Sequence, residues 1–476
     1  MFNIDGSPSP ARPAPGGSKL PHSRYILRAM DAAFSEKIAT LYRAHITVLK
    51  LRHDRALDAA GFDHAVIFAG AQHVAFLDDM GYPFKVNPHF KYWVPIVDNP
   101  HCVLVYTPGV KPRLIYHQPV DYWHKPAGPP EGWWTAPFDI EVIAKPEDAA
   151  KLIPKSGRIA FIGEWDDSFK AWGKLESNPP SLLNRLHFDR AWKTEYEIEC
   201  IRAANETGAR GHKAAEKAFR AGESEYEIHL AYLRAASTTE DELPYGNIIA
   251  VNDNAAVLHY YHHDRNVLDK KERHSFLIDA GASYNGYASD ITRTYSQRRD
   301  EFAELIKAVD KAQLELCDAV VPKANYPDIH MMAHRKVAEL LKEFKFVDLD
   351  PDAIVEKRIS STFLPHGVGH YLGLQVHDVG GFQKDPEGTT IPKPEGHPYL
   401  RLTRVVEPSH VFTIEPGLYF IEPLLAELRK SENAKYVKWK KVDSFRKFGG
   451  IRIEDNVVVT DNGHDNLTRE AFAALA

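Results

Sequence analysis

Residues 276–295 constrain the fold more than any other part of the chain, because they place two aspartates on either side of a tight turn. The Asn-Gly pair at 285–286 is a strong signal for a two-residue hairpin, since both positions tolerate positive φ. With that turn at the centre, Asp279 faces Thr292, and Asp279 and Asp290 lie diagonally on one face. Two carboxylates that converge in this way both stay ionised only if a cation or a proton lies between them. Aspartates that merely occupy turns are the alternative, so other segments must decide.

Imidazole and carboxylate side chains recur further along the chain in glycine-rich or apolar segments. His366, His370 and His377 lie in PHGVGHYLGLQVHD, where the glycines leave the imidazoles open to approach. Glu415 follows the apolar run VFTI and precedes a proline, which places it at the end of a strand. These segments weigh against a purely structural role for the aspartates.

Arg452 and Glu454 lie two residues apart in the strand-like run GGIRIEDNVVV, so they share one face of the predicted strand. Charges inside apolar strands are costly unless they are paired or bind a metal. Two aspartates, two glutamates and at least one histidine form an oxygen-rich set that suits Mn²⁺, Co²⁺, Fe²⁺ or Mg²⁺, with Zn²⁺ as a further option. A carboxylate-rich set can also bridge two ions about 3.5–4 Å apart. The pattern therefore predicts a centre for divalent metal ions.

The length of 476 residues predicts two or three domains, and 44% hydrophobic with 26% charged residues is typical of a globular chain. The net charge of −6 gives no basic field for a phosphate backbone, so we expect no nucleic-acid partner. We also expect no membrane association, because no apolar run approaches the roughly 20 residues that cross a bilayer.

The cysteines predict neither a disulfide framework nor a thiolate metal site. There are three of them, Cys102, Cys200 and Cys317, and they are far apart in the sequence and in no C-x-x-C spacing. Because no signal peptide opens the chain either, a cytoplasmic protein is the expected localisation.

Composition and pattern divide the chain into three segments of an α/β (α+β) protein. Residues 1–29, rich in proline, glycine and serine, predict a disordered leader, with a start codon assigned too early or a transit peptide as alternative explanations. Residues 30–186 begin with a helical pattern and continue with short strands, which indicates an α/β domain with a mixed sheet. Residues 187–476 alternate long amphipathic helices with the strands that carry the polar residues.

Taken together and in order, these segments resemble the pita-bread metallopeptidases, and specifically the bacterial Xaa-Pro dipeptidases (prolidases), whose relatives include the organophosphorus acid anhydrolases. The likeness runs from about residue 34 to the C-terminus and includes FLDDMGYPFKVNPHFKYWVP and KTEYEIECIR. It implies a creatinase-like domain at 30–186, serving dimerisation and covering the pocket, and a pita-bread catalytic domain at 187–476. It also implies two divalent ions per subunit, Mn²⁺ by family expectation, held by Asp279, Asp290, His370, Glu415 and Glu454.

The resemblance also implies roles around that centre. His377 is expected to face the oxyanion, and Glu415 to carry a proton from the water to the leaving nitrogen. The substrate-binding residues implied or inferred beside these are His259, His366, Tyr245, Arg452 and Asp79. Arg452 suits a free C-terminal carboxylate because its guanidinium binds in a fork, although a salt bridge to a neighbour is the alternative. Asp79 is expected to reach the pocket of a partner subunit in a homodimer.

The expected function is therefore hydrolysis of Xaa-Pro dipeptides by hydroxide bridging two metal ions, since such ions lower the pKa of water toward neutrality. Phosphotriester hydrolysis is a conceivable side activity of the same nucleophile. Two alternatives stay open. One is an aminopeptidase P acting on longer Xaa-Pro peptides, and the other is a non-catalytic pita-bread module that binds peptides or proteins.

Overall fold

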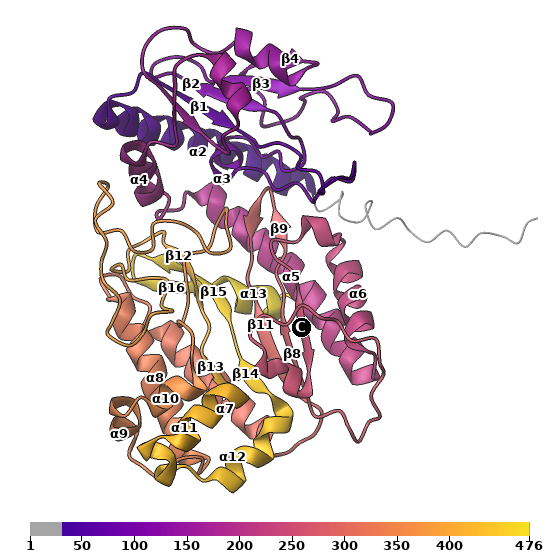
Figure 1. The fold of residues 1–476 in the computed structure, drawn as a ribbon, viewed down its shortest axis with the longest axis vertical. Coiled ribbons are helices and arrows are strands. Elements are labelled where there is room, and N and C mark those ends of the chain that lie inside the picture. The colour runs from indigo at the N-terminus through magenta and orange to yellow at the C-terminus, as the bar shows by residue number, and fades with distance from the viewer. Residues whose placement is uncertain (1–30, 476) are drawn as a thin grey trace, which may run out of the picture.

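The protein, described by a computed structural model over residues 31–475, has an N-terminal part above a larger C-terminal part in the view of Figure 1. The expected leader at 1–29 lies outside the described residues. Within them, no helix is long and apolar enough to span a membrane. Cys102, Cys200 and Cys317 are buried and form no disulfide, as the sequence predicts.

The N-terminal part is built on one six-stranded mixed sheet in the order β4-β3-β2-β1-β5-β6. Strand β1 pairs antiparallel with β2 and parallel with β5, which confirms the predicted mixed sheet. The strands are β1 (His64–Phe68), β2 (Val103–Tyr106), β3 (Arg113–His117), β4 (Asp139–Ile143), β5 (Ile159–Ile162) and β6 (Leu175–Ser177). The accompanying helices are α2 (Asp31–Ala60), α3 (Pro88–Trp93) and α4 (Pro180–Asp189).

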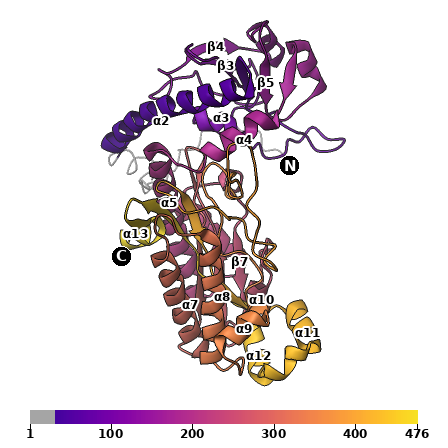
Figure 2. The ribbon, with the colours of Figure 1, turned by 90° about the vertical axis from the view of Figure 1, so that its left-hand side faces the viewer.

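The C-terminal part opens with the long helix α5 (Glu195–Ala221), whose ends follow from the sequence. Thr194 and Glu197 form a capping box at its start, and Gly222 ends it with a φ of 98°, which favours glycine. Helices α7 (Glu301–Asp318) and α8 (Tyr326–Glu343) run side by side in Figure 2 and contact each other. The remaining helices are α6 (Glu225–Ala236), α9 (Pro351–Glu356), α10 (Ile359–Phe363), α11 (Glu422–Lys430), α12 (Trp439–Phe445) and α13 (Leu467–Ala473).

The strands of the C-terminal part form small antiparallel sheets in the orders β11-β8-β7, β12-β15-β16, β13-β14 and β10-β9. Isolated bridges from Thr292 to Glu454 and from Tyr371 to Phe412 bring separate segments together. The strands are β7 (Ile248–Val251), β8 (Ser275–Asp279), β9 (Ser283–Tyr284), β10 (Tyr287–Ala288), β11 (Thr292–Ser296), β12 (Val411–Ile414), β13 (Gly417–Tyr419), β14 (Gly450–Arg452), β15 (Asp455–Thr460) and β16 (Gly463–Asn466).

The predicted hairpin is confirmed. Asn285 and Gly286 have φ values of 49° and 83°, as a two-residue turn with positive φ at both positions requires. Thr292 pairs with Asp279 in the register that the turn predicts. The backbone therefore carries both aspartates toward the strands of the second half of the domain.

Candidate metal centre

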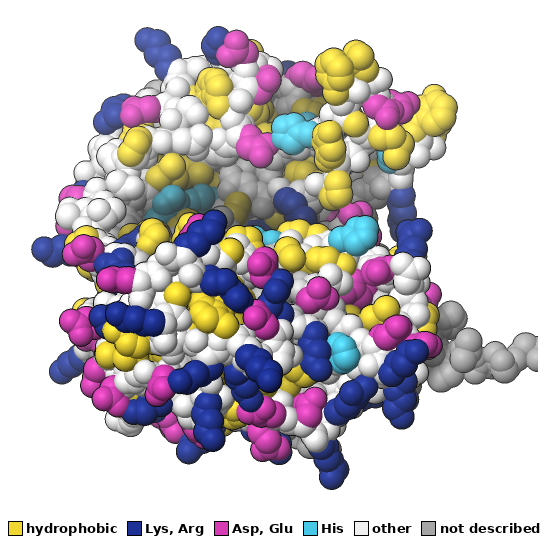
Figure 3. Space-filling view, turned by 60° about the horizontal axis from the view of Figure 1, so that its bottom comes forward, with side chains coloured by type: hydrophobic (Ala, Val, Ile, Leu, Met, Phe, Trp, Pro, Cys, Tyr) yellow, Lys and Arg dark blue, Asp and Glu magenta, His cyan; other side chains and the backbone are white. Residues whose placement is uncertain are grey.

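Two of the predicted ligands, Asp279 and Asp290, line a cavity of about 1140 Å³. Its lining includes Asp279, Asp290 and His377 from the C-terminal part and Phe84 and Lys85 from the N-terminal part. The space-filling view in Figure 3 shows a hollow in the molecule with histidine and hydrophobic side chains along its edge. The two aspartates thus border a space that a small molecule can enter.

Asp279 and Asp290 converge, as the hairpin register predicts. Asp279 ends β8, and Asp290 lies between β10 and β11; both side chains are buried. The hydroxyl of Tyr245 lies 2.8 Å from Oδ1 of Asp279 and 2.6 Å from Oδ1 of Asp290. A single hydroxyl group therefore reaches both carboxylates and fixes their spacing.

His370 presents one ring nitrogen to the aspartates. Its Nδ1 hydrogen-bonds the carbonyl oxygen of Tyr371 at 3.0 Å, which leaves Nε2 to face the carboxylates. Nε2 lies 3.4 Å from Oδ2 of Asp290 and 3.7 Å from Oε1 of Glu415. Glu415 follows β12, and its backbone N–H donates to the carbonyl oxygen of Val368, which joins the two segments.

Glu454 completes the group through Thr292. The Thr292 hydroxyl donates to Oε2 of Glu454 at 2.7 Å, and the Glu454 backbone N–H donates to the Thr292 carbonyl oxygen. One ligand atom each of Asp290, His370 and Glu454 lie within 4.8 Å of one another. These three side chains thus come from three separate stretches of sequence that meet at one point.

Burial sets the electrostatics of the carboxylates. It raises the pKa of Glu415 to about 7 and the pKa of Glu454 well above its ordinary value, and neighbouring negative charges raise the latter further. Burial and the charge of Asp290 also raise the pKa of Asp279, although Arg452 opposes them. For Asp290 the effect of burial is outweighed by the hydrogen bond and charge of His370, which bring its pKa below the ordinary value.

Four carboxylates and one imidazole in a buried cluster fit divalent cations. The fit follows from the donor set, since oxygen ligands with one nitrogen suit Mn²⁺ and similar ions. It also follows from charge, because four carboxylates gather where Arg452 pairs with Asp279 and His370 lies near Asp290 and Glu415, and a cation would reduce their mutual repulsion.

Arg452 shares a face with Glu454 but pairs with a different residue. Its Nη2 donates to Oδ2 of Asp279 at 2.7 Å, Nη1 donates to the Tyr419 hydroxyl at 2.9 Å, and Nε donates to the Thr292 hydroxyl at 3.2 Å. The side chain is buried. These contacts match the salt-bridge alternative, while carboxylate binding by Arg452 stays a prediction.

The three histidines predicted to act on the substrate differ in how close they lie to the predicted metal ligands and in how exposed they are. The His377 ring centroid is 4.4 Å from that of His370. His366 Nδ1 lies 3.7 Å from Oε2 of Glu415, and its Nε2 is 2.8 Å from the Tyr419 hydroxyl. His259 is exposed on the lining of the cavity.

Asp79 stands apart from the other predicted residues. It lies on an exposed loop that the Val74–Gly81 bridge closes, and it is not among the described residues that line the cavity of its own chain. The carboxylate of Asp78 accepts backbone N–H donors from Asp79 and Met80, as a turn cap does.

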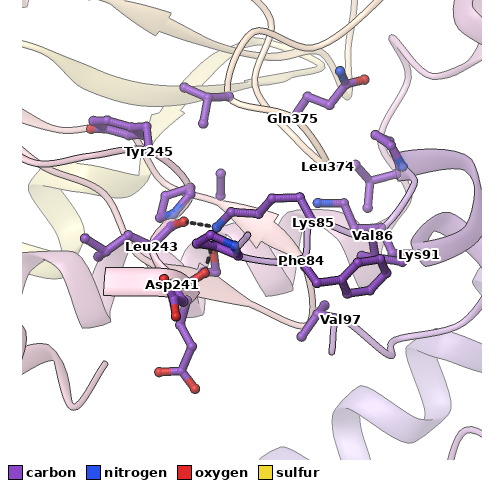
Figure 4. A pocket seen from close by; sticks show the side chains of 18 of the residues that line it. Phe84, Lys85, Val86, Lys91, Val97, Asp241, Leu243, Tyr245, Leu374 and Gln375 are labelled. Carbon is purple, nitrogen blue, oxygen red and sulfur yellow. Dashed lines mark hydrogen bonds between the residues drawn. The ribbon is translucent and has the colours of Figure 1, made fainter. Parts of the chain in front are cut away.

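The N-terminal part supports the cavity through Lys85. Its ammonium donates to the carbonyl oxygens of Asp241 and Leu243, at 2.7 and 2.9 Å (Figure 4). Leu243 is two residues from Tyr245, so this contact holds the segment that brings the tyrosine to the aspartates.

Sequence reasoning missed Thr292 and Tyr419, which hold Glu454, Arg452 and His366 in place. The register already placed Thr292 opposite Asp279, and that position was a usable signal. Nothing in the sequence alone pairs Tyr419 with Arg452, since that contact depends on strands β13 and β14 meeting.

Two family profiles match the chain. One described as "Xaa-Pro dipeptidase, N-terminal domain" matches residues 40–188, and one described as "Metallopeptidase family M24" matches residues 199–461. The chain therefore belongs to the metallopeptidase family M24, whose members use divalent metal ions.

Relatives narrow the resemblance further. The chain is 48% identical over 436 residues to an Xaa-Pro dipeptidase of Pseudoalteromonas translucida (strain TAC 125) and 50% identical to one of Shewanella oneidensis. Each match covers 91% of this chain and 99% of the relative. The resemblance to bacterial Xaa-Pro dipeptidases is thereby confirmed, and so is the enzyme class that it implies.

Solved structures confirm the fold class. Aminopeptidase PepP of Pseudomonas aeruginosa matches with a TM-score of 0.66 and 24% identity, over 89% of this chain and 98% of that one. Proline aminopeptidase P II of Yersinia pestis matches with a TM-score of 0.67 and 22% identity, over 92% of this chain and 100% of that one.

Proposed function

We propose that this protein hydrolyses Xaa-Pro dipeptides and releases C-terminal proline, with two divalent ions, Mn²⁺ foremost, held by its buried carboxylate cluster. The observation that carries the proposal is the convergence of that cluster beside a cavity, in a chain about half identical to Xaa-Pro dipeptidases. The proposed ligands are Asp279, Asp290, His370, Glu415 and Glu454.

When bound, divalent cations supply an activated water and a positive charge beside the carbonyl oxygen of the substrate. Glu415 takes the proton of that water and returns it to the departing proline nitrogen. A carboxylate can accept and then donate a proton in this way.

His377 donates a hydrogen bond to the carbonyl oxygen as that oxygen gains negative charge. Burial and the charge of His370 lower the pKa of His377 to about 3, so the ring is neutral and keeps one N–H to donate. His366 and His259 contact the substrate, and Tyr245 lines the pocket for the N-terminal side chain.

Two roles for Arg452 are separable. In one it holds Asp279 and Tyr419, which its contacts support. In the other it binds the free carboxylate of the dipeptide. Comparing Leu-Pro with Leu-prolinamide in Arg452→Lys distinguishes them. Carboxylate binding predicts a rise in KM for Leu-Pro alone, whereas a positioning role predicts a loss of kcat on both substrates.

The proposal extends to assembly and location. We place the protein in the cytoplasm as a homodimer, with the N-terminal domain ending near residue 186 and contributing the dimer contact. In the dimer, the Asp79 loop reaches the cavity of the partner. The exposed apolar residues around Asp79, among them Phe76, Leu77 and Met80, support a contact of this kind.

The substrate class is tested with a panel of peptides. Faster turnover of Leu-Pro than of Arg-Pro-Pro is expected, while faster turnover of the longer peptide would make the protein an aminopeptidase P. Adding a phosphotriester to the panel tests the side activity that we propose for the same nucleophile. Activity that survives complete metal removal would contradict the proposal and favour a metal-independent function.

The proton shuttle is tested by Glu415→Gln, which preserves shape but cannot carry a proton. A loss of about 10²–10⁴ in kcat is expected. Glu422→Gln is the matched control, since Glu422 is an exposed glutamate paired with Arg446. Near-normal turnover by Glu415→Gln with Mn²⁺ bound would rule out the shuttle.

A further inference from the structure

Three histidines meet outside the carboxylate centre. His330 and His334 lie one turn apart on α8, so their side chains share a face of the helix. His397 comes from the long segment between α10 and β12 and reaches the same point. One ring nitrogen of each histidine lies within 4.8 Å of a ring nitrogen of the other two.

The rings are arranged around a common point. Their centroids lie 4.5–4.7 Å apart, and the ring planes cross at 69–86°. His330 Nε2 and His397 Nδ1 are 2.9 Å apart. Nitrogens that share a tetrahedral ion at about 2.0–2.1 Å are roughly 3.3 Å apart, so a small displacement of the half-buried His397 would admit an ion.

Hydrogen bonding within the cluster is incomplete. His330 and His334 are 1% and 2% exposed, yet His330 Nδ1 and His334 Nε2 have no hydrogen-bond partner among the residues that the structure describes. The other nitrogen of His334, Nδ1, lies 3.2 Å from the hydroxyl of Ser360. When Nδ1 donates to this hydroxyl, the Nε2 lone pair is left free to bind an ion, as with an outer partner of a metal-binding histidine.

The protonation of the three histidines and the charge of a nearby arginine determine which kind of ion the cluster can bind. Burial lowers the pKa of all three histidines, to about 2 for His330 and about 3 for His334, so the rings are neutral at pH 7. The Arg358 guanidinium lowers the pKa of His397 further and opposes a cation. Imidazole nitrogens therefore have to supply the affinity, which favours a borderline ion over a hard one.

We propose that His330, His334 and His397 form a second metal site that binds one Zn²⁺, or another borderline divalent ion, with solvent as the fourth ligand. It differs from the carboxylate centre in its donors, since three nitrogens suit Zn²⁺ where oxygen-rich ligands suit Mn²⁺. A bound ion ties the segment that carries His397 to α8, and Ser360 links the site to α10. This site does not depend on the proposed peptidase activity.

Metal content tests the site without reference to activity. Metal-free protein is dialysed against excess free Zn²⁺, then against metal-free buffer, and the Zn²⁺ per chain is measured by elemental analysis. His397→Gln should hold one Zn²⁺ fewer than the unaltered protein, and His334→Gln should show the same loss. His464→Gln is the matched control, because His464 is a half-buried histidine on β16 outside the cluster, and it should lose none.

Thermal unfolding of each variant shows whether it is folded, and Co²⁺ provides a second reading. Co²⁺ in the proposed site should give the visible absorption of a four-coordinate nitrogen-rich ion, and His397→Gln should lose that absorption while staying folded. Equal Zn²⁺ content in all folded variants, or a Co²⁺ spectrum that His397→Gln leaves unchanged, would overturn the proposal and leave a hydrogen-bonded histidine cluster. Loss of Zn²⁺ in Glu454→Gln alone would instead report on the carboxylate centre.

Discussion

Glu415→Gln should change how the stability of the metal-free protein depends on pH. Burial raises the pKa of this carboxyl from 4.5 to about 7, although the charges of His370 and Arg452 oppose the rise. In the unfolded chain the carboxyl loses its proton near pH 4.5, while in the folded protein it keeps the proton until about pH 7. Between these values the folded state binds more protons, so the free energy of unfolding falls as the pH rises.

The size of the fall follows from the two pKa values. A difference of about 2.5 pH units corresponds to about 3 kcal/mol, at 1.36 kcal/mol per unit. Glutamine does not ionise, so the free energy of unfolding of Glu415→Gln does not fall in this way as the pH rises. The variant should therefore gain about 3 kcal/mol relative to the unaltered protein between pH 4.5 and pH 7.5, with most of the gain complete by pH 7.

The assay is urea unfolding of chelator-treated protein at pH 4.5, 6.0 and 7.5, followed by fluorescence. At each pH, the free energy of unfolding of the variant is compared with that of the unaltered protein. Groups whose pKa values the substitution does not change contribute equally to both proteins, so their titration cancels in the difference. Glu432→Gln, at an exposed glutamate, is the control and should keep a constant difference. A constant difference for Glu415→Gln as well would refute the argument that burial governs this carboxyl.

Three further predictions concern a tyrosine and a glycine beside the centre and a buried ion-pair group elsewhere. Tyr245→Phe removes the hydroxyl that reaches Asp279 and Asp290, so metal affinity should fall about 10- to 100-fold, as measured by competition with a chelator. Asp378→Asn leaves the buried Arg190 and Lys193 without their carboxylate and should lower the free energy of unfolding by about 3–5 kcal/mol, while Asp443→Asn at an exposed pair should leave the melting temperature nearly unchanged. Gly369→Ala would press its Cβ against the Thr413 carbonyl oxygen beside His370, so metal content and activity should fall, whereas Gly463→Ala has open space around it and should have neither effect. Full metal content in Tyr245→Phe or Gly369→Ala, or an unchanged unfolding curve for Asp378→Asn, would contradict the respective prediction.

Turns, helix ends and strands were predictable because interactions between residues close in the sequence determine them. The Asn-Gly turn sets the register that brings Asp279 and Asp290 together, and it was read from two residues. The helices also follow from local signals; for example, the capping box at Thr194 and the glycine at 222 bound α5. Short apolar runs separated by turns likewise indicated strands of the N-terminal sheet.

The meeting of distant segments was harder to predict, because no local pattern encodes it. Period-two spacing placed Arg452 beside Glu454, but the partner of Arg452 is Asp279, 173 residues away. The cluster of His330, His334 and His397 is a similar case, since His330 and His397 are 67 residues apart. Only the resemblance to a family joined the five ligands before the structure did, and the domain boundaries near residues 30 and 187 stay predictions.

The most direct test of the account is X-ray diffraction from crystals grown with Mn²⁺, recorded where manganese scatters anomalously. Two peaks are predicted among the side chains of Asp279, Asp290, His370, Glu415 and Glu454, with both peaks lost in Asp290→Asn. No anomalous peak among these five side chains in a crystal of folded, Mn²⁺-loaded protein would contradict the central claim.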